Sequence, residues 1–295
     1  MDHDVAIIGG SFAGLSAAMQ LARARRKVVV VDDGQPRNRF AAHSHGFLGQ
    51  DGRAPAEILD EARRQLLAYP TASIVQGRAE RCGGTKGAFA VDLPDGSSLM
   101  AARLILACGV TDTLPDIPGL RERWGRTVAH CPYCHGYEIP AGSIGVLATG
   151  PMSSHQAQLV ADWAPVVFFH NGVQPEDAHA HPRHAITVER ERVEAIEDDA
   201  AGLAVRLADG RRVALAALFT APRTHPAGGI AEALGCALED GPLGPHVRVD
   251  GTQQTSVAGV FAAGDINRKA ANVAIVVADG AMAGAAAHRS LVFEA

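Results

Sequence analysis

The strongest constraint on the fold is an internal repeat of strand–turn–helix–strand units. Residues 4–14 begin with an apolar strand pattern, pass through a glycine-rich turn and lead into a helix, and residues 143–153 have the same order. Each copy is followed by a second apolar strand, at residues 28–31 and 166–169. Because such units align their strands in parallel, the repeat predicts two related nucleotide-binding domains.

Each copy of the repeat is followed by a predicted β-hairpin. Residues 89–96 and 203–210 alternate apolar and polar side chains and end in Asp-Gly, a dipeptide that favours tight turns between antiparallel strands. Each hairpin leads into another apolar strand, at residues 104–107 and 217–220. We therefore expect an α/β fold with two Rossmann-like domains, each a three-layer ββα arrangement of helices, parallel sheet and hairpin layer.

Proline-containing segments mark the predicted domain boundaries. Residues 114–119 contain two prolines, which oppose helix formation, and a second linker is expected near residues 222–226. The apolar strand at residues 260–265 would complete the first domain and make it discontinuous. The first domain is thus predicted to comprise residues 1–114 and 223–295, and the second residues 115–222.

Composition and charge exclude several functional classes. Apolar residues make up 47% of the 295 residues, which is typical of a globular protein, and the net charge of −5 with scattered basic residues argues against a nucleic-acid partner. The longest apolar run, residues 271–287, contains Asp279 and two glycines, so no membrane span is expected. The first strand starts almost at the N-terminus, which leaves no room for a signal peptide. Five cysteines, an odd number, argue against a disulfide framework, and a cytoplasmic location is expected.

The turn in the first copy matches a dinucleotide-binding fingerprint. Gly9 permits the tight turn, Gly14 allows the helix to pack closely on the strand, and Ser11 stands where a second glycine is usual. Asp32 ends the next strand, where an acid bonds a ribose hydroxyl. Backbone amides at the helix start would face the pyrophosphate. The predicted contacts of this turn are Gly9, Ser11, Phe12, Ala13 and Gly14.

The turn in the second copy has lost most of this fingerprint. It reads Ala148-x-Gly150-x-x-Ser153, and His170 occupies the position that corresponds to Asp32. NAD would require an acid at that position and NADP would require arginines for its 2′-phosphate. We therefore predict that this domain persists as a scaffold and does not bind NADPH productively.

The motif that carries the chemistry is Cys131-Pro132-Tyr133-Cys134-His135. Pro132 suits a first helical turn, so the cysteines are expected at a helix start, where the helix dipole favours the thiolate. A redox-active disulfide is the favoured interpretation, and a zinc site or an inert buried pair are the alternatives. Zinc would need two more ligands and no second C-x-x-C exists, so no metal is predicted. The remaining cysteines are interpreted as buried space-fillers: Cys82, Cys108 and Cys236.

Several motifs together resemble the low-molecular-weight thioredoxin reductase family over nearly the whole chain. They are residues 9–14, residues 107–109, the Cys131/Cys134 pair and residues 255–265. The resemblance implies that the first domain binds FAD, that Asp265 after Gly264 bonds its ribityl chain, and that the protein is a homodimer. That family carries His-Arg-Arg at the position of His170, and this chain keeps only the histidine.

A subgroup of that family is a better match around the cysteines. The reductases usually have Asp directly after the second cysteine, whereas this chain has His135, whose imidazole can move protons near neutral pH. The run from Cys131 to Glu138 resembles the FAD-dependent dithiol oxidases of gliotoxin- and holomycin-type natural products. Residues 45–52 resemble them too, and on that basis His45 and Asp51 are candidate flavin contacts, with His43 a further possibility. These oxidases use O2 in place of NADPH.

We therefore predict an FAD-dependent thiol oxidase. A substrate thiolate would attack Cys131 of the Cys131–Cys134 disulfide, a second thiol would release the oxidised substrate, and Cys134, nearer the flavin by resemblance, would pass electrons on to O2. The substrate is a small-molecule dithiol or a protein thiol. Two alternatives stay open: a reductase of the thioredoxin reductase type that uses NADPH or another donor, and a non-catalytic flavin redox sensor. The histidines of a later loop rich in proline and alanine are interpreted as solvated surface: His179, His181 and His184.

Overall fold

The chain folds into two compact units in the computed structural model, which describes residues 2–173 and 181–294. Unit 1 contains the chain up to Arg39, Phe47–Thr111 and the chain from Thr224 onward, and unit 2 contains Phe40–Gly46 and Asp112–Arg223. Segment 40–46 therefore clusters with unit 2, although the sequence assigns it to the first domain. Phe40 packs closely over Gly125 and His45 pairs with Glu138, which accounts for this placement.

Unit 1 is built on a mixed sheet in the strand order β3-β2-β1-β6-β5-β4, with β19 also paired to β6. The strands β3, β2, β1, β6 and β19 run parallel, and β4 and β5 add an antiparallel hairpin. Side chains in β2 are buried on both faces, as parallel sheets covered on both sides require. The strands are β1 (His3–Ile8), β2 (Val28–Asp32), β3 (Ala72–Gln76), β4 (Arg81–Thr85), β5 (Ala88–Asp92), β6 (Ser98–Leu106) and β19 (Val260–Ala262).

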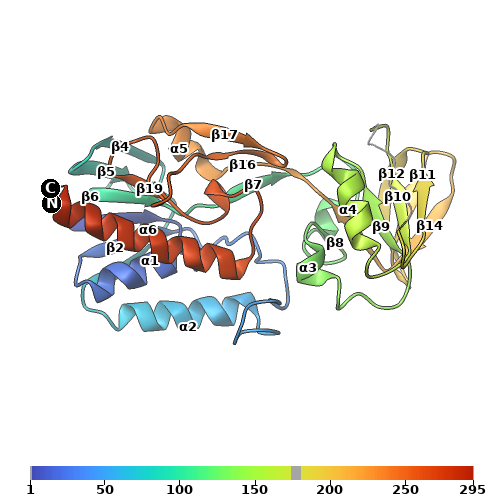
Figure 1. Cartoon of the computed structure of the whole chain (residues 1–295), viewed down its shortest axis with the longest axis horizontal. Coiled ribbons are helices and arrows are strands. Elements are labelled where there is room, and N and C mark those ends of the chain that lie inside the picture. The colour runs from blue at the N-terminus through green and yellow to red at the C-terminus, as the bar shows by residue number, and fades with distance from the viewer. Residues whose placement is uncertain (1, 174–180, 295) are drawn as a thin grey trace. The chain divides into compact units, whose positions relative to one another are not determined.

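Three helices cover one face of this sheet: α1 (Phe12–Arg23), α2 (Pro55–Leu67) and α6 (Val273–Phe293) (Figure 1). Helices α1 and α6 approach so closely that a Cβ on Gly280 would lie 2.1 Å from the Ala13 carbonyl oxygen. The Ser16 hydroxyl also donates to the Val277 carbonyl at 2.7 Å. This contact fixes the start of α1, which is the part of the helix that follows the first glycine-rich turn.

The opposite face of the unit 1 sheet forms a second apolar core with the C-terminal part of the chain. This part contains η2 (Ala227–Gly229), α5 (Ile230–Ala233), β17 (Leu238–Gly241), β18 (Gly244–Val247) and η3 (Asp265–Asn267). Strands β17 and β18 form an antiparallel hairpin. Strand β19 pairs with β6 and so belongs to the same sheet as β1. The first domain is therefore assembled from segments that are distant in the sequence, as predicted.

Unit 2 repeats the design with a parallel sheet in the order β11-β10-β9-β15-β8 and a separate antiparallel sheet β12-β13-β14. The parallel strands are β8 (Val128–Ala129), β9 (Ile144–Leu147), β10 (Val166–Phe169), β11 (Ile186–Glu189) and β15 (Ala217–Thr220). The antiparallel strands are β12 (Val193–Asp199), β13 (Gly202–Leu207) and β14 (Arg212–Leu215), and the helices are η1 (Arg121–Arg123), α3 (Pro132–His135) and α4 (Met152–Val160). The expected Rossmann-type α/β fold and both Asp-Gly hairpins are confirmed.

Besides the two ends of segment 40–46, the chain passes between the units at residues 111–112 and 223–224. Strands β7 (Val110–Thr113) and β16 (Arg223–Pro226) lie at these last two passages and pair with each other as a two-stranded sheet. Among the described residues, no helix has both the length and the apolar character needed to cross a membrane.

The close approach of α1 and α6 predicts that a glycine-to-alanine substitution in α6 lowers the free energy of unfolding. Replacing glycine by alanine inside a helix normally stabilises it by up to about 1 kcal/mol. Gly280→Ala is expected to destabilise unit 1 by about 1–3 kcal/mol instead, because the new methyl group would overlap the Ala13 carbonyl. Urea unfolding checks this. Ala285→Gly, at an exposed position of the same helix, is the control and should cost only its helix propensity. A stabilised Gly280→Ala protein would contradict the packing described above.

Candidate functional site

The candidate site residues of both units follow the carboxyl ends of parallel strands. In unit 1, Gly9 follows β1, Asp32 ends β2 and Gly264 follows β19. In unit 2, Ala148 follows β9, His170 follows β10 and Cys131 comes two residues after β8. Ligands of open α/β sheets bind at this edge, so the fold brings together the residues of each predicted site.

The first turn can be formed only with glycine at its two key positions. Gly9 has φ of +103°, and a Cβ there would lie 2.3 Å from the Ala107 carbonyl oxygen. A Cβ on Gly14 would lie 1.8 Å from the Gly9 carbonyl oxygen. The backbone therefore folds tightly between β1 and α1 and leaves a cradle without side chains, which fits the close approach of a pyrophosphate.

The start of α1 is arranged for a ligand of this kind. Ser11 is the N-cap, but its side chain makes no capping hydrogen bond, and Phe12 and Ala13 are buried in the first turn. Because the first amides of a helix have no partners within the helix, they need an acceptor from outside. A bound anion can supply that acceptor.

Asp32 lies beside this turn and is held from two sides. One carboxylate oxygen accepts from the Gly10 amide at 3.0 Å, and the other accepts from Arg63 at 3.2 Å. Asp32 is 8% exposed, so the two bonds orient a nearly buried carboxylate at the end of β2. The sequence pattern identifies Asp32 but not Arg63, which comes from α2. A ribose contact from Asp32 stays a prediction.

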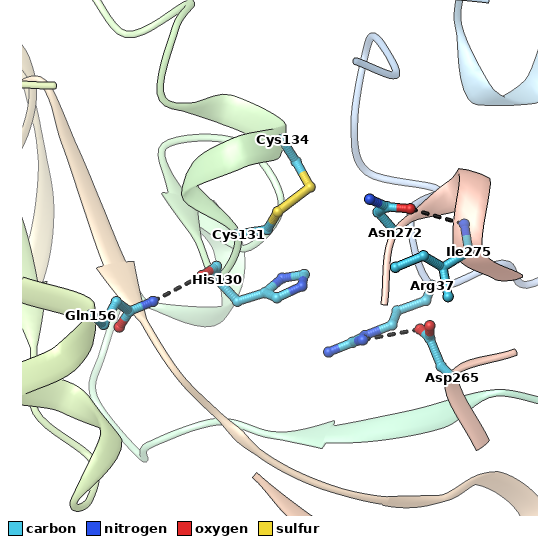
Figure 2. Close-up of a disulfide and its surroundings, with 8 residues drawn as sticks. All are labelled: Arg37, His130, Cys131, Cys134, Gln156, Asp265, Asn272 and Ile275. Carbon is cyan, nitrogen blue, oxygen red and sulfur yellow. Dashed lines mark hydrogen bonds and ion pairs between the residues drawn. A yellow bond between two sulfur atoms is a disulfide. The ribbon is translucent and has the colours of Figure 1, made fainter. Parts of the chain in front are cut away.

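Asp265 is positioned by backbone geometry and by an arginine that the sequence analysis missed. Gly264 has φ of +90°, a conformation that favours glycine, and it places Asp265 at the start of η3. The Asp265 carboxylate accepts from Arg37 at 3.0 Å (Figure 2). Arg37 follows β2 in the sequence, and its pairing with η3 depends on a contact between distant segments.

A buried polar network holds η3 in place. Asp279 on α6 is 1% exposed and accepts from Arg268 and from the Gln253 amide, the latter at 3.1 Å. The Asn267 side-chain amide donates to the side-chain oxygen Oε1 of Gln253 at 2.7 Å. A buried carboxylate is stable only with such partners. The network therefore holds the backbone of η3, which includes Asp265.

The second turn is closed by its own serine. The Ser153 hydroxyl accepts from the Thr149 amide at 2.9 Å and from the Gly150 amide at 3.3 Å. Ser153 is 1% exposed, and Pro151, which has no amide hydrogen, is the N-cap of α4. Two backbone amides of this turn, those of Thr149 and Gly150, are thus already paired inside the protein.

The residue after His170, the counterpart of Asp32, makes a contact within unit 2. Asn171, which follows His170, has φ of +49°, and its side-chain oxygen accepts from the Val193 amide at 2.9 Å. This bond ties the end of β10 to the start of β12. The residues after β10 therefore fasten the two sheets of unit 2 together.

Cys131 and Cys134 form a disulfide on a short helix (Figure 2). Cys131 is the N-cap of α3 and Pro132 is its first residue, as the sequence predicts. Helix α3 contains four residues, so its dipole adds little to thiolate stability. Both cysteines are partly exposed. A substrate thiol can therefore reach the disulfide.

Helix α4 and Trp163, three residues beyond its end, contact the segment that carries the disulfide. The Gln156 amide donates to the His130 carbonyl at 2.8 Å, directly before Cys131 (Figure 2). Trp163 contacts the Tyr133 ring edge-on with 5.7 Å between centroids. The disulfide and the second turn are therefore joined through one rigid helix.

His135 lies next to Cys134 in a small cluster of titratable groups. Burial lowers the pKa of His135, the Glu138 carboxylate raises it, and His45 lowers it. His45 Nδ1 lies 3.5 Å from Glu138 Oε1. Sequence reasoning named His45 as a candidate flavin contact, and the structure places it against Glu138, while Asp51 is exposed in the loop before α2.

The other cysteines are poorly suited to redox chemistry. Burial raises the pKa of Cys82 to about 12 and also raises the pKa of Cys236. Burial likewise raises the pKa of Cys108 to about 12, and its thiol donates to the Ala227 carbonyl at 3.4 Å. Because the thiolate is the reactive form, these three thiols stay inert near neutral pH.

The histidine-rich loop of unit 2 lies partly outside the described residues, and His179 is among those left out. His184 Nδ1 lies 2.8 Å from the Ala161 carbonyl oxygen, and His181 accepts from the Arg183 amide at 3.3 Å. Within residues 2–173 and 181–294, no group of three or more His, Cys, Asp or Glu is placed to hold a metal ion.

Comparison with known protein families identifies one match over almost the whole chain. Residues 3–285 match the family described as pyridine nucleotide-disulphide oxidoreductase. The thioredoxin reductase tcpT of Claviceps purpurea is 37% identical over 98% of this chain and 94% of its own length. This relative confirms the resemblance inferred from the motifs.

Solved structures give the same result. An oxidoreductase from Agrobacterium tumefaciens is 51% identical with a TM-score of 0.93, and the match covers 100% of both chains. The protein HlmI is 38% identical with a TM-score of 0.89 over 99% of this chain and 93% of its own. The fold, both units included, is therefore shared with flavoprotein-type disulfide oxidoreductases.

The closed second turn can be tested by removing its acceptor. Ser153→Ala is expected to destabilise the protein by about 1–2 kcal/mol, because two amides lose their hydrogen-bond acceptor. Urea unfolding measures the loss, and His155→Ala, at an exposed position of the same helix, serves as control. Equal stability of the two variants would mean that Ser153 does not cap the turn.

The difference between the cysteines predicts a simple labelling pattern. After reduction, iodoacetamide at pH 8 should modify Cys131 and Cys134 quickly and leave Cys82, Cys108 and Cys236 unmodified. The thiolate fraction of a thiol with a pKa of about 12 is only about one in ten thousand at that pH. Peptide mapping by mass spectrometry reads the result, and labelling in guanidinium confirms that all five sites can react. Rapid native labelling of Cys108 would refute the assignment.

Proposed function

This chain belongs to the pyridine nucleotide-disulphide oxidoreductase family, and we propose that it is an FAD-dependent dithiol oxidase that uses O2 as electron acceptor. The observation that carries the proposal is the closed second turn. Its Thr149 and Gly150 amides are paired with Ser153, and the two residues after His170 are Asn171 and Gly172, not the arginines that bind a 2′-phosphate. Electrons would then enter at the thiols and not from NADPH.

The cofactor of this family is FAD, and the unit 1 site fits it. Gly9, Ser11 and Gly14 would hold the pyrophosphate on the α1 amides, Asp32 the adenosine ribose, and Asp265 the ribityl chain. Bound FAD supplies a two-electron acceptor that O2 can reoxidise with release of H2O2. Arg37 would then orient Asp265 and balance its charge.

The thiol chemistry proceeds by two exchange steps. A substrate thiolate attacks Cys131 Sγ, the bond to Cys134 breaks, and Cys134 leaves as a thiolate. The second substrate thiolate then attacks the first substrate sulfur, forms the product disulfide and releases Cys131. The substrate loses two electrons and two protons, and the pair Cys131 and Cys134 gains the two electrons.

His135 is suited to take the first of these protons. Its lowered pKa keeps the imidazole neutral near pH 7, so a ring nitrogen can accept the proton of an incoming thiol. The position next to Cys134 keeps this base beside the disulfide through both exchanges. We propose small-molecule dithiols as substrates, protein thiols being the alternative, in a cytoplasmic homodimer.

A reductase that uses NADPH is the second candidate, because tcpT of Claviceps purpurea is named a thioredoxin reductase. It would require the second turn to open, with loss of the Ser153 hydrogen bonds, before a pyrophosphate could bind. A flavin redox sensor without turnover is the third. The three candidates differ in the compound that reduces the flavin and in whether turnover continues.

The deciding experiment uses the purified FAD-loaded protein. Under anaerobic conditions, dithiothreitol should bleach the flavin band at about 450 nm, NADPH should leave it unchanged, and admission of O2 should restore it. In air, O2 uptake and H2O2 formation should match the disulfide formed and continue for many turnovers.

Two variants act as matched controls for this experiment. Cys134→Ser should abolish O2 uptake, whereas Cys236→Ser, a buried cysteine far along the chain, should retain it. Bleaching by NADPH within seconds would overturn the oxidase proposal in favour of a reductase. Bleaching by dithiol without further O2 uptake would indicate a sensor.

A further inference from the structure

Arg63 on α2 contacts both parts of the first nucleotide-binding turn. Its Nη2 atom donates to Asp32 Oδ2 at 3.2 Å and to the Gly10 carbonyl oxygen at 3.5 Å. Its Nη1 atom donates to Asp60 on the same helix at 3.1 Å, which orients the guanidinium group. The helix, the turn and the end of β2 come from separate segments of unit 1, and they meet at this one side chain.

The Asp32 carboxylate can accept more hydrogen bonds than these contacts use. An ionised carboxylate offers about four lone-pair positions on its two oxygens. The Gly10 amide uses one position on Oδ1, and Arg63 uses one on Oδ2. Each oxygen can therefore accept a further hydrogen bond, which suits the neighbouring 2′- and 3′-hydroxyls of a ribose.

We propose that Arg63 is a positioning residue for the adenosine ribose of FAD, which fixes the plane of the Asp32 carboxylate so that Asp32 recognises the ribose 2′-hydroxyl. The terminal torsion of an aspartate side chain has a broad energy well, so one bond to the Gly10 amide does not fix that plane. A second bond from Arg63 to the other oxygen does. The proposal rests on the proposed FAD site of unit 1 and does not depend on whether thiols or NADPH reduce the flavin.

A merely structural role of Arg63 predicts a different result. An ion pair that only ties α2 to the sheet, with the arginine side chain 28% exposed, would add little to stability and would not distinguish one part of FAD from another. Arg37 is a matched comparison in unit 1, because it is 25% exposed and donates to the Asp265 carboxylate at 3.0 Å (Figure 2). Asp265 is the proposed ribityl contact, so Arg37 should affect the flavin end of the cofactor and not the ribose end.

The test compares FAD with an analogue whose adenosine ribose lacks the 2′-hydroxyl, and both are titrated into the flavin-free full chain. Quenching of flavin fluorescence gives the two dissociation constants. The wild type should bind FAD about tenfold more tightly than the analogue, which is the value of one hydrogen bond to a charged group. Arg63→Gln and Arg63→Met should weaken FAD binding about tenfold and reduce the preference for FAD to about twofold or less.

Control variants separate positioning from a general loss of binding, and circular dichroism confirms that each variant is folded. Arg37→Gln should weaken binding of FAD and of the analogue by the same factor and so keep the preference. Arg64→Gln, at an exposed position of α2, should change neither constant. Equal binding of FAD and the analogue by the wild type, or an undiminished preference in both Arg63 variants, would overturn the proposal even in a protein that consumes O2. A preference lost only in the Arg63 variants would uphold it, even if NADPH reduced the flavin and the oxidase function were rejected.

Discussion

The amides at the start of a helix need acceptors, and the two glycine-rich turns of this chain meet that need in different ways. At α1, Ser11 makes no capping bond, and glycines keep the cradle clear of side chains. At α4, the Ser153 hydroxyl oxygen accepts hydrogen bonds from the amides of Thr149 and Gly150. The first turn therefore has no side-chain cap at its helix start, while the second turn pairs two of its amides with its own serine.

Helix α4 links the second turn to the segment that carries the disulfide. Helix α4 begins at the Ser153 turn, and Gln156 on the same helix holds the backbone next to Cys131. In a reductase, this helix would have to serve a bound nucleotide as well as the disulfide. The hydrogen bonds of Ser153 and Gln156 are made within unit 2, so they hold α4 and the backbone before Cys131 without a ligand.

Local patterns were sufficient to predict the fold and the family. The repeated units at residues 4–14 and 143–153 are present as β1–α1 and β9–α4, because strand periodicity and turn glycines act over short stretches of chain. Contacts between distant segments lie beyond such patterns. The sequence identifies Ser153 only as a missing glycine, and it does not reveal that His45 meets Glu138 or that Arg37 meets Asp265.

The electrostatics of His135 suit thiol exchange in either direction. Oxidation of a dithiol needs a base near the disulfide, and a half-buried imidazole with a lowered pKa is neutral near pH 7. The same imidazole can return its proton to a departing thiolate in the reverse reaction, because both directions pass through one transition state. The argument for thiols as the electron donor therefore depends on the second turn, where Ser153 pairs with two backbone amides.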